Sequence, residues 1–136
     1  MSKNINIGSA FLKFTFTDED GEVFSSFRLN PADIKLGQRC QEMAAYFSGL
    51  SERIPQTATV EDAVKFNDEL EDKICYLLGY DAKQSLFGQI SATSIMADGN
   101  MFAVHVMNQI IDAVGPEIEK RKNAMKKAAQ YTAKYQ

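Results

Sequence analysis

The spacing of apolar residues changes once along this chain, and that change constrains the fold more than any other feature. Before residue 30 the apolar side chains recur at every second position, which indicates strands with one buried face. After residue 30 they recur at every third or fourth position, which indicates amphipathic helices. The chain has 136 residues, the size of one ordinary domain. We therefore predict a single domain over residues 1–136, of the α+β class and mainly helical, with an N-terminal β-hairpin followed by about four α-helices.

The β-hairpin is predicted over residues 5–29, with an acidic turn that contains Gly21 between its strands. Glycine and short acids tolerate the left-handed backbone that such a turn requires. The acids could suggest a calcium loop, but the ligand pattern of an EF-hand is missing, so we interpret the segment as a solvated turn. The apolar positions of the two strands are Ile5, Ile7, Leu12, Phe14 and Phe16, and then Val23, Phe27 and Leu29.

The helices are predicted at residues 31–51, 60–78, 101–114 and 117–134. Asn30 is expected to cap the first helix, while Thr59 and Gly79 should begin and end the second. Gly115 and Pro116 should separate the last two helices, because proline lacks an amide hydrogen and disfavours helix at the preceding residue. The expected buried stripes are Leu36, Cys40, Met43, Phe47 and Leu50 in the first helix, and Val60, Ala63, Asn67, Leu70, Ile74 and Leu77 in the second.

The net charge of −3 conceals an uneven distribution of charge. Residues 1–119 carry 9 Lys or Arg and 18 Asp or Glu, a balance of −9, whereas residues 120–136 carry six cations and no acid. Such asymmetry indicates either an interacting tail or an end that folds back on the acidic body. The acidic run from Asp68 to Asp72 offers a docking face for the second alternative, although a water-facing surface is the simpler interpretation.

Residues that could support catalysis or bind a metal are scarce. His105 is the only histidine and has no acid within four residues, so we interpret it as a packed or edge residue. Cys40 and Cys75 belong to no Cys-x-x-Cys pair and are expected to pack as small hydrophobic residues. Phosphate-binding loops, nucleophile elbows and zinc motifs are missing from the sequence. We therefore expect no catalytic residue, no metal site and no cofactor, and we predict that the protein is not an enzyme.

Secretion and membrane insertion are also disfavoured. The first eight residues contain no apolar core of the length that a secretory signal needs, so a cytoplasmic location is expected. The longest uninterrupted apolar stretches, such as residues 44–47 and 75–78, are only four residues long. A spanning helix needs about 20 such residues. The basic helix has mostly Ala and Met on its apolar face, which gives it little to insert into a membrane surface.

The order of these elements resembles that of the small tail assembly chaperones encoded by long-tailed, siphovirus-type phages and prophages of Gram-positive bacteria. The similarity covers nearly the whole chain, and its motifs are structural patterns rather than catalytic signatures. They are a Phe-rich hairpin, the helix start Asn30-Pro31-Ala32-Asp33, an acidic helix ending Cys75-Tyr76-Leu77-Leu78-Gly79, the turn Leu86-Phe87-Gly88, and a terminal Lys-Arg-x-x-x-Lys-Lys-x-x-x-Tyr-x-x-x-Tyr helix.

The resemblance implies a non-enzymatic protein made in the host cytoplasm and absent from the mature virion. Members of the family are thought to bind the long, helical tape measure protein and to recruit tail tube subunits to it. A fraction of the chains is often extended by a programmed ribosomal frameshift, so a frameshift-extended form of the same chain is a further expected partner. Lys126-Lys127 fits such a frameshift, since consecutive lysine codons can supply a run of adenines. A solvated helix face explains the same pair more simply.

Candidate partner-binding residues lie in the final basic helix. They combine cations with amphipathic rings and are Lys126, Lys127, Tyr131 and Tyr135. The same residues could instead dock on the acidic run from Asp68 to Asp72. The alternative function is that of a small nucleic-acid-binding or regulatory protein that uses this helix. Residues 1–119, with a net charge of −9, would however repel a nucleic acid beyond the reach of the basic helix. An enzyme subunit is the least favoured reading.

Overall fold

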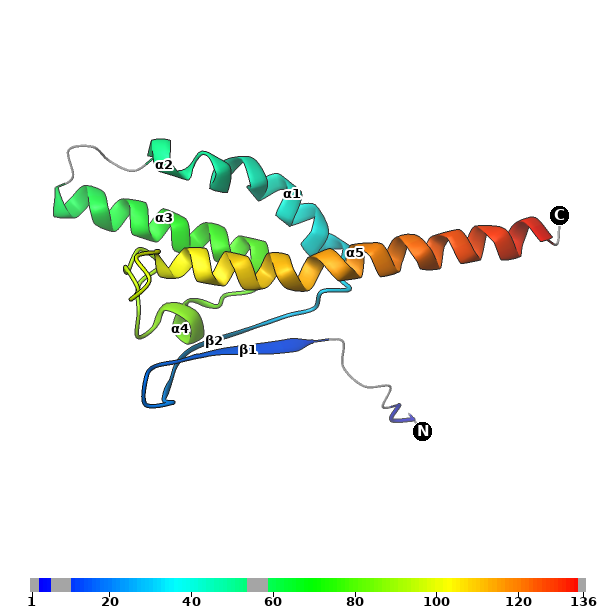
Figure 1. The fold of residues 1–136 in the computed structure, drawn as a ribbon, viewed down its shortest axis with the longest axis horizontal. Coiled ribbons are helices and arrows are strands. Elements are labelled where there is room, and N and C mark those ends of the chain that lie inside the picture. The colour runs from blue at the N-terminus through cyan, green and yellow to red at the C-terminus, as the bar shows by residue number, and fades with distance from the viewer. Residues whose placement is uncertain (1–2, 6–10, 54–58, 135–136) are drawn as a thin grey trace.

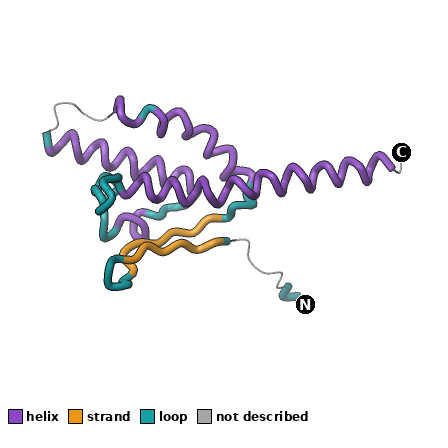
Figure 2. Tube along the Cα trace, in the orientation of Figure 1, coloured by secondary structure: helices purple, strands orange, loops and turns teal. Residues whose placement is uncertain are grey.

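The computed structural model describes residues 3–5, 11–53 and 59–134, with the backbone alone for residues 51, 53 and 131–134. These residues form an antiparallel hairpin followed by helices, which confirms the mainly helical α+β class. The hairpin lies along one side of the helices (Figures 1 and 2). Its strands are β1 (Leu12–Thr17) and β2 (Val23–Leu29), and the helices are α1 (Ile34–Ser48), α2 (Leu50–Arg53), α3 (Val60–Leu78), α4 (Lys83–Phe87) and α5 (Phe102–Lys134).

The hairpin is confirmed, but it is shorter than predicted. Ile5 is exposed and outside any strand, and Ile7 lies outside the described residues. Gly21 adopts a φ of 81°, and the carboxylate of Asp18 accepts hydrogen bonds from the backbone of Asp20 (2.9 Å) and Glu22 (3.0 Å), so the acids build the turn. The strand register shifts between Phe16 and Thr17, which leaves Val23 exposed rather than buried as expected.

The start of α1 differs from the prediction. Its N-cap is Asp33, whose side chain accepts from the backbone N–H of Lys35 at 2.9 Å. Asn30 instead closes a turn before the helix by accepting from the N–H of Ala32 at 3.1 Å. Asn30 and Asp33 can both cap free N–H groups, and the path of the chain after β2 makes Asp33 the cap. The predicted helix 31–51 is also interrupted at Gly49, which separates α1 from α2.

Both predicted ends of α3 are confirmed. Thr59 accepts from the N–H of Asp62 at 3.1 Å, and Gly79 takes the left-handed conformation (φ 84°) with its N–H directed to the carbonyls of Cys75 and Tyr76. The predicted stripe is buried only in the second half of the helix, because Val60 is exposed and no described element covers the first turn.

The break predicted at Gly115 and Pro116 is wrong. α5 runs without interruption from Phe102 to Lys134 and includes Pro116. The preceding turns are held in the core by Val106, Ile110 and Val114, and strong helix formers follow the proline. Pro116 is exposed. Its presence costs the helix one backbone hydrogen bond and crowds the preceding turn.

The core forms where α1, α3, α4, β2 and the first half of α5 meet. Phe102 is fully buried at its centre, with the ring of Phe16 edge-on at 5.0 Å and that of Phe87 edge-on at 6.2 Å. Ser25 is buried in the hairpin and donates to the carbonyl of Leu86 at 2.7 Å, which fixes α4 on β2. Among the described residues, the remaining fully buried large side chains are Leu29, Leu36, Leu70, Ile74, Leu77, Leu86, Val106 and Ile110.

Cys40 and Cys75 are half-buried free cysteines packed against this core. Burial raises the pKa of both thiols, with Arg39 acting in the opposite direction at Cys40. Both side chains therefore pack as small hydrophobic residues, as expected.

Candidate protein-binding surface

The second half of α5 extends away from the rest of the molecule (Figure 1). We call residues 117–134 the arm. At 1.5 Å per residue it is about 27 Å long. From residue 118 to residue 130 every side chain is exposed. The pairs Glu117–Lys120 (3.2 Å) and Glu119–Lys122 (3.6 Å) lie one turn apart within the arm, and its Ala, Lys and Gln residues favour helix by themselves.

Two of the four predicted contact residues can be placed with their side chains. Lys126 and Lys127 are exposed on the arm, and within the described part of the chain neither makes a side-chain hydrogen bond or ion pair. Tyr131 belongs to α5, but its side chain lies outside the described residues, as does all of Tyr135. The arm therefore presents uncompensated positive charge to solvent.

The alternative that the basic end docks on the acidic run of its own chain is wrong. The run from Asp68 to Asp72 lies on α3, and the arm leads away from it (Figure 1). Asp72 pairs instead with Lys83 at 2.5 Å. One continuous helix spans the core and the arm, and it carries the basic end away from α3.

A groove of about 320 Å³ separates the first turns of α1 from the beginning of the arm. We call it the α1–arm groove. Three apolar side chains along it are exposed: Ile34 by 63%, Ile118 by 46% and Met125 by 66%. Val114 is buried at its inner end. The other lining residues are Pro31, Asp33, Gly37, Gln38, Gln41, Glu117, Arg121 and Lys122.

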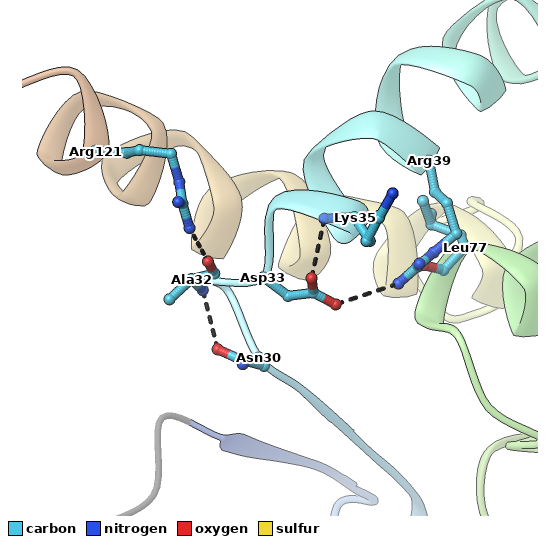
Figure 3. A network of polar contacts seen from close by, with 7 residues as sticks. All are labelled: Asn30, Ala32, Asp33, Lys35, Arg39, Leu77 and Arg121. Carbon is cyan, nitrogen blue, oxygen red and sulfur yellow. Dashed lines mark hydrogen bonds and ion pairs between the residues drawn. The ribbon is translucent and has the colours of Figure 1, made fainter. Parts of the chain in front are cut away.

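A polar network connects the arm with the turn before α1 beside this groove (Figure 3). Arg121 of the arm donates to the carbonyl of Ala32, in the turn that Asn30 closes. Asp33 caps α1 and lies 3.8 Å from the guanidinium of Arg39, whose Nε donates to the carbonyl of Leu77 at 2.9 Å. Through these contacts the ends of β2, α1, α3 and the arm are linked.

A second groove, of about 700 Å³, lies between α1 and α3. Tyr76 lines it and donates to the carboxylate of Glu42 at 2.5 Å, and this hydrogen bond raises the pKa of the phenol. The predicted acidic run contributes three carboxylates, but two lysines of α3 reduce the local negative charge. The lining residues are Met43, Lys65, Asp68, Glu69, Asp72, Lys73 and Tyr76.

Some polar residues of α3 serve the fold rather than a site. Glu71, which we expected on the water-facing side, accepts from the backbone N–H of Ala92 at 3.1 Å and from the amide of Asn67 at 2.8 Å. Asn67 in turn accepts from the N–H and the hydroxyl of Thr93, at 3.0 and 2.9 Å. These bonds attach the segment before α5 to α3.

His105 has an acidic partner that sequence spacing missed. Its Nε2 lies 2.9 Å from Oδ2 of Asp98, seven residues earlier in a turn that contains Gly99 at a φ of 87°. Hydrogen bonds from the backbone of Asn100 and from His105 hold the pKa of Asp98 below its usual value. Thr17 lines the same hollow but makes no hydrogen bond with His105. The pair ties the turn to α5.

Comparisons with models of known protein families, with curated proteins and with solved structures find no match for this chain. Within residues 3–5, 11–53 and 59–134, no three His, Cys, Asp or Glu side chains gather as a metal site would require. Over the same ranges, no helix combines the length and the apolar character needed to cross a membrane.

Proposed function

We propose that this chain is a non-enzymatic phage tail assembly chaperone, which binds the tape measure protein and recruits tail tube subunits during tail morphogenesis. Its place of action is the host cytoplasm, and the mature virion lacks it. The observation that carries the proposal is the exposed arm beside the α1–arm groove, where Ile118 and Met125 face solvent. The resemblance in element order supplies the identity of the partner.

The geometry suits a long helical partner. A tape measure helix exposes apolar stripes before the tail tube encloses it, and an amphipathic arm can cover such a stripe by helix-in-groove contacts. The exposed apolar side chains are spread along the groove rather than gathered in a deep pocket. Such an interface favours modest affinity, which a chaperone needs in order to release its client.

Co-expression with the tape measure protein tests the proposal directly. We expect the two chains to co-purify and the tape measure protein to become more soluble. Ile118→Gln should weaken co-purification, whereas Val64→Gln is the matched control, because Val64 on α3 is similarly exposed (51%) and lies away from the groove. Failure to bind or solubilise the partner would refute the proposal. A gene order with a tail tube gene upstream and a very long tape measure gene downstream would support it.

A frameshift-extended form of the chain belongs to the same proposal. In such a form the helix of the arm continues into the extension, which would place the added domain beyond the body. The nucleotide sequence tests this point: a slippery run of adenines at Lys126-Lys127, followed by an overlapping frame, supports it. A gene with neither feature removes this part of the proposal and leaves tape measure binding in place.

The position of the arm also favours the alternative, nucleic-acid binding. The arm carries Lys126 and Lys127 about 15 Å beyond its first residue and away from the acidic body, whereas charges are screened beyond about 8 Å at physiological salt. The acidic residues before the arm therefore repel a nucleic acid bound at Lys126 and Lys127 less strongly than their net charge predicts. A mobility shift with a steep salt dependence would establish this alternative, and its absence would exclude it.

A further inference from the structure

A pocket of about 340 Å³ lies where the end of β2 meets the first turn of α1 and the end of α3. Among the described residues, three cations line it, Arg28, Lys35 and Arg39, together with one acid, Asp33. Residues 1–119 carry 9 Lys or Arg against 18 Asp or Glu, so three of the nine cations of this acidic part gather at one pocket. We call it the cation pocket. Its other lining residues are Phe11, Leu29, Asn30, Leu36, Leu78, Gly79 and Tyr80.

The two guanidinium groups are held on the wall of the cation pocket. Arg39, which also donates to the end of α3, lies so close to Gly79 that a Cβ added there would be 2.7 Å from its Nη2. The guanidinium carbon of Arg28 lies 5.2 Å from the ring centroid of Tyr80 and 5.4 Å from that of Phe11. Both groups therefore sit at adjacent residues of the wall, and cation–π contacts hold Arg28 in place before any ligand binds.

The positive charge of the cation pocket is only partly compensated. Asp33 places Oδ2 3.8 Å from Arg39, beyond hydrogen-bonding distance, while its Oδ1 accepts from the backbone N–H of Lys35 (Figure 3). Within the described part of the chain, the side chains of Arg28 and Lys35 form no ion pair. Lys13 lies directly opposite Arg28 across the hairpin, and like charges in that position destabilise a sheet. An anion in the pocket would offset this repulsion.

The size and the apolar wall of the cation pocket define the ligand further. Its volume falls in the range of small-molecule sites, about 300–1,000 Å³. Leu29, Leu36 and Leu78 line it with apolar carbon. An arginine fork matches the two oxygens of a carboxylate with parallel N–H donors. Asp33 also lines the pocket, which disfavours a dianion such as phosphate relative to a singly charged carboxylate.

We propose that the cation pocket binds a carboxylate that adjoins an apolar side chain. This chemistry belongs both to a polypeptide that ends in an apolar residue and to a free N-acylated amino acid. Arg28 and Arg39 pair with the carboxylate, Lys35 adds positive charge, and the apolar side chain of the ligand packs against the leucines of the wall. The inference does not depend on the proposed function.

The test is a ¹H–¹⁵N NMR titration of the full chain at constant ionic strength. The probes are N-acetyl-L-leucine, the uncharged N-acetyl-L-leucinamide, and inorganic phosphate. We expect N-acetyl-L-leucine to shift the amide signals of Gly79 and Tyr80 in a saturable way, with a dissociation constant of about 10 mM or below. The amide should bind at least about tenfold more weakly, because it brings no charge to the guanidinium groups.

A peptide separates the two sources of the carboxylate. Acetyl-Gly-Gly-Leu ends in the same residue as the first probe and adds backbone before it. If the peptide binds more tightly than N-acetyl-L-leucine, the pocket takes the end of a polypeptide. If the two bind equally, the pocket recognises the terminal residue alone, as a free N-acylated amino acid provides it.

Substitution of Arg28 gives the decisive comparison. Arg28→Gln should weaken binding of N-acetyl-L-leucine about tenfold or more. Its melting temperature should stay close to that of the wild type, because relief of the repulsion from Lys13 opposes the loss of ring stacking. Lys65→Gln is the matched control, since Lys65 is an exposed cation of α3 outside the cation pocket. It should preserve binding.

Arg39→Gln should weaken binding as well, and it also loses the hydrogen bond to the carbonyl of Leu77. A melting curve of this variant reports the structural part of its effect. The proposal is overturned if Arg28→Gln keeps wild-type affinity or if the acid and the amide bind equally. It is also overturned if phosphate binds more tightly than N-acetyl-L-leucine, or if the shifts are confined to the arm.

Discussion

Arg121, in the first turns of the arm, donates a hydrogen bond to the backbone carbonyl of Ala32, in the turn that precedes α1 (Figure 3). This contact joins residues 89 positions apart and connects the two sides of the α1–arm groove. Because Asp33 follows at once as the N-cap of α1, the position of the arm and the start of α1 depend on each other.

Arg121→Ala should loosen the arm with little effect on the core. The contact is exposed, so we expect the free energy of unfolding to fall by less than about 1 kcal/mol. Amide hydrogen exchange in residues 114–122 should rise at the same time. Lys120→Ala is the control, because Lys120 pairs only within the arm, with Glu117, and its loss should leave that exchange nearly unchanged.

Phe102→Ala should be strongly destabilising. The ring is fully buried and contacts the rings of Phe16 and Phe87, so its removal leaves a cavity that the fold cannot easily close. We expect a loss of about 3–5 kcal/mol in urea denaturation. Ile111→Ala, at an exposed position of the same helix, should stay within about 0.5 kcal/mol of the wild type. Equal effects of the two substitutions would contradict the position of the core.

Pro116→Ala should stabilise α5. The substitution restores the N–H that can donate to the carbonyl of Asp112 and removes the clash of the proline ring. We expect slower amide exchange around residue 116 and a gain of about 1 kcal/mol or more in stability. If helix content by circular dichroism rose clearly instead of staying nearly constant, the wild-type helix would be broken at Pro116 in solution and the continuous helix would be wrong.

Asp98→Asn should destabilise the protein in a pH-dependent way. In the folded state the pKa of Asp98 lies below its usual value of 3.8, so its ionised form contributes stability above that pH. This contribution is lost as the pH falls through the folded-state pKa. The difference from wild type should therefore be largest above about pH 5 and shrink in stronger acid. Gln109→Ala, at an exposed uncharged position of the helix that carries His105, should leave the pH dependence of stability unchanged.

The two cysteines should react slowly with iodoacetamide at neutral pH. Burial raises the pKa of both thiols, which leaves less of the reactive thiolate than in an exposed cysteine. We expect alkylation to be slower than that of free cysteine and to accelerate once urea unfolds the chain. Rapid labelling of the native protein at either thiol would contradict the packing of Cys40 and Cys75 against the core.

Local signals in the sequence were reliable where a few neighbouring residues decide the structure. Thr59 and Gly79 mark the ends of α3 because the side chain of one and the left-handed φ of the other satisfy the helix's own free groups. Gly21 and Asp18 build the hairpin turn in the same local way. The apolar spacing likewise predicted the class of the fold and the burial of Leu36, Leu70, Ile74 and Leu77. The other positions of the two predicted stripes are only partly buried or exposed.

Predictions failed where distant residues compete with local preference. Asn30 and Asp33 are both good caps, and the choice between them depends on the route from β2 into α1. Pro116 would break an isolated helix, but burial of Val114 and the residues before it holds α5 together. His105 has no acid within four residues, and only the fold of the turn around Gly99 brings Asp98 to it.

The candidate protein-binding surface was likewise predictable from the sequence only in part. The sequence by itself determined that the end of the chain is a basic helix, because helix propensity and charge belong to the residues themselves. Only the tertiary structure decided that this helix extends the core helix without a break, points away from the acidic run on α3, and forms a groove with Ile34 and Gly37 of α1. Such relations depend on which faces pack together, and packing joins residues whose separation along the chain carries no local signal.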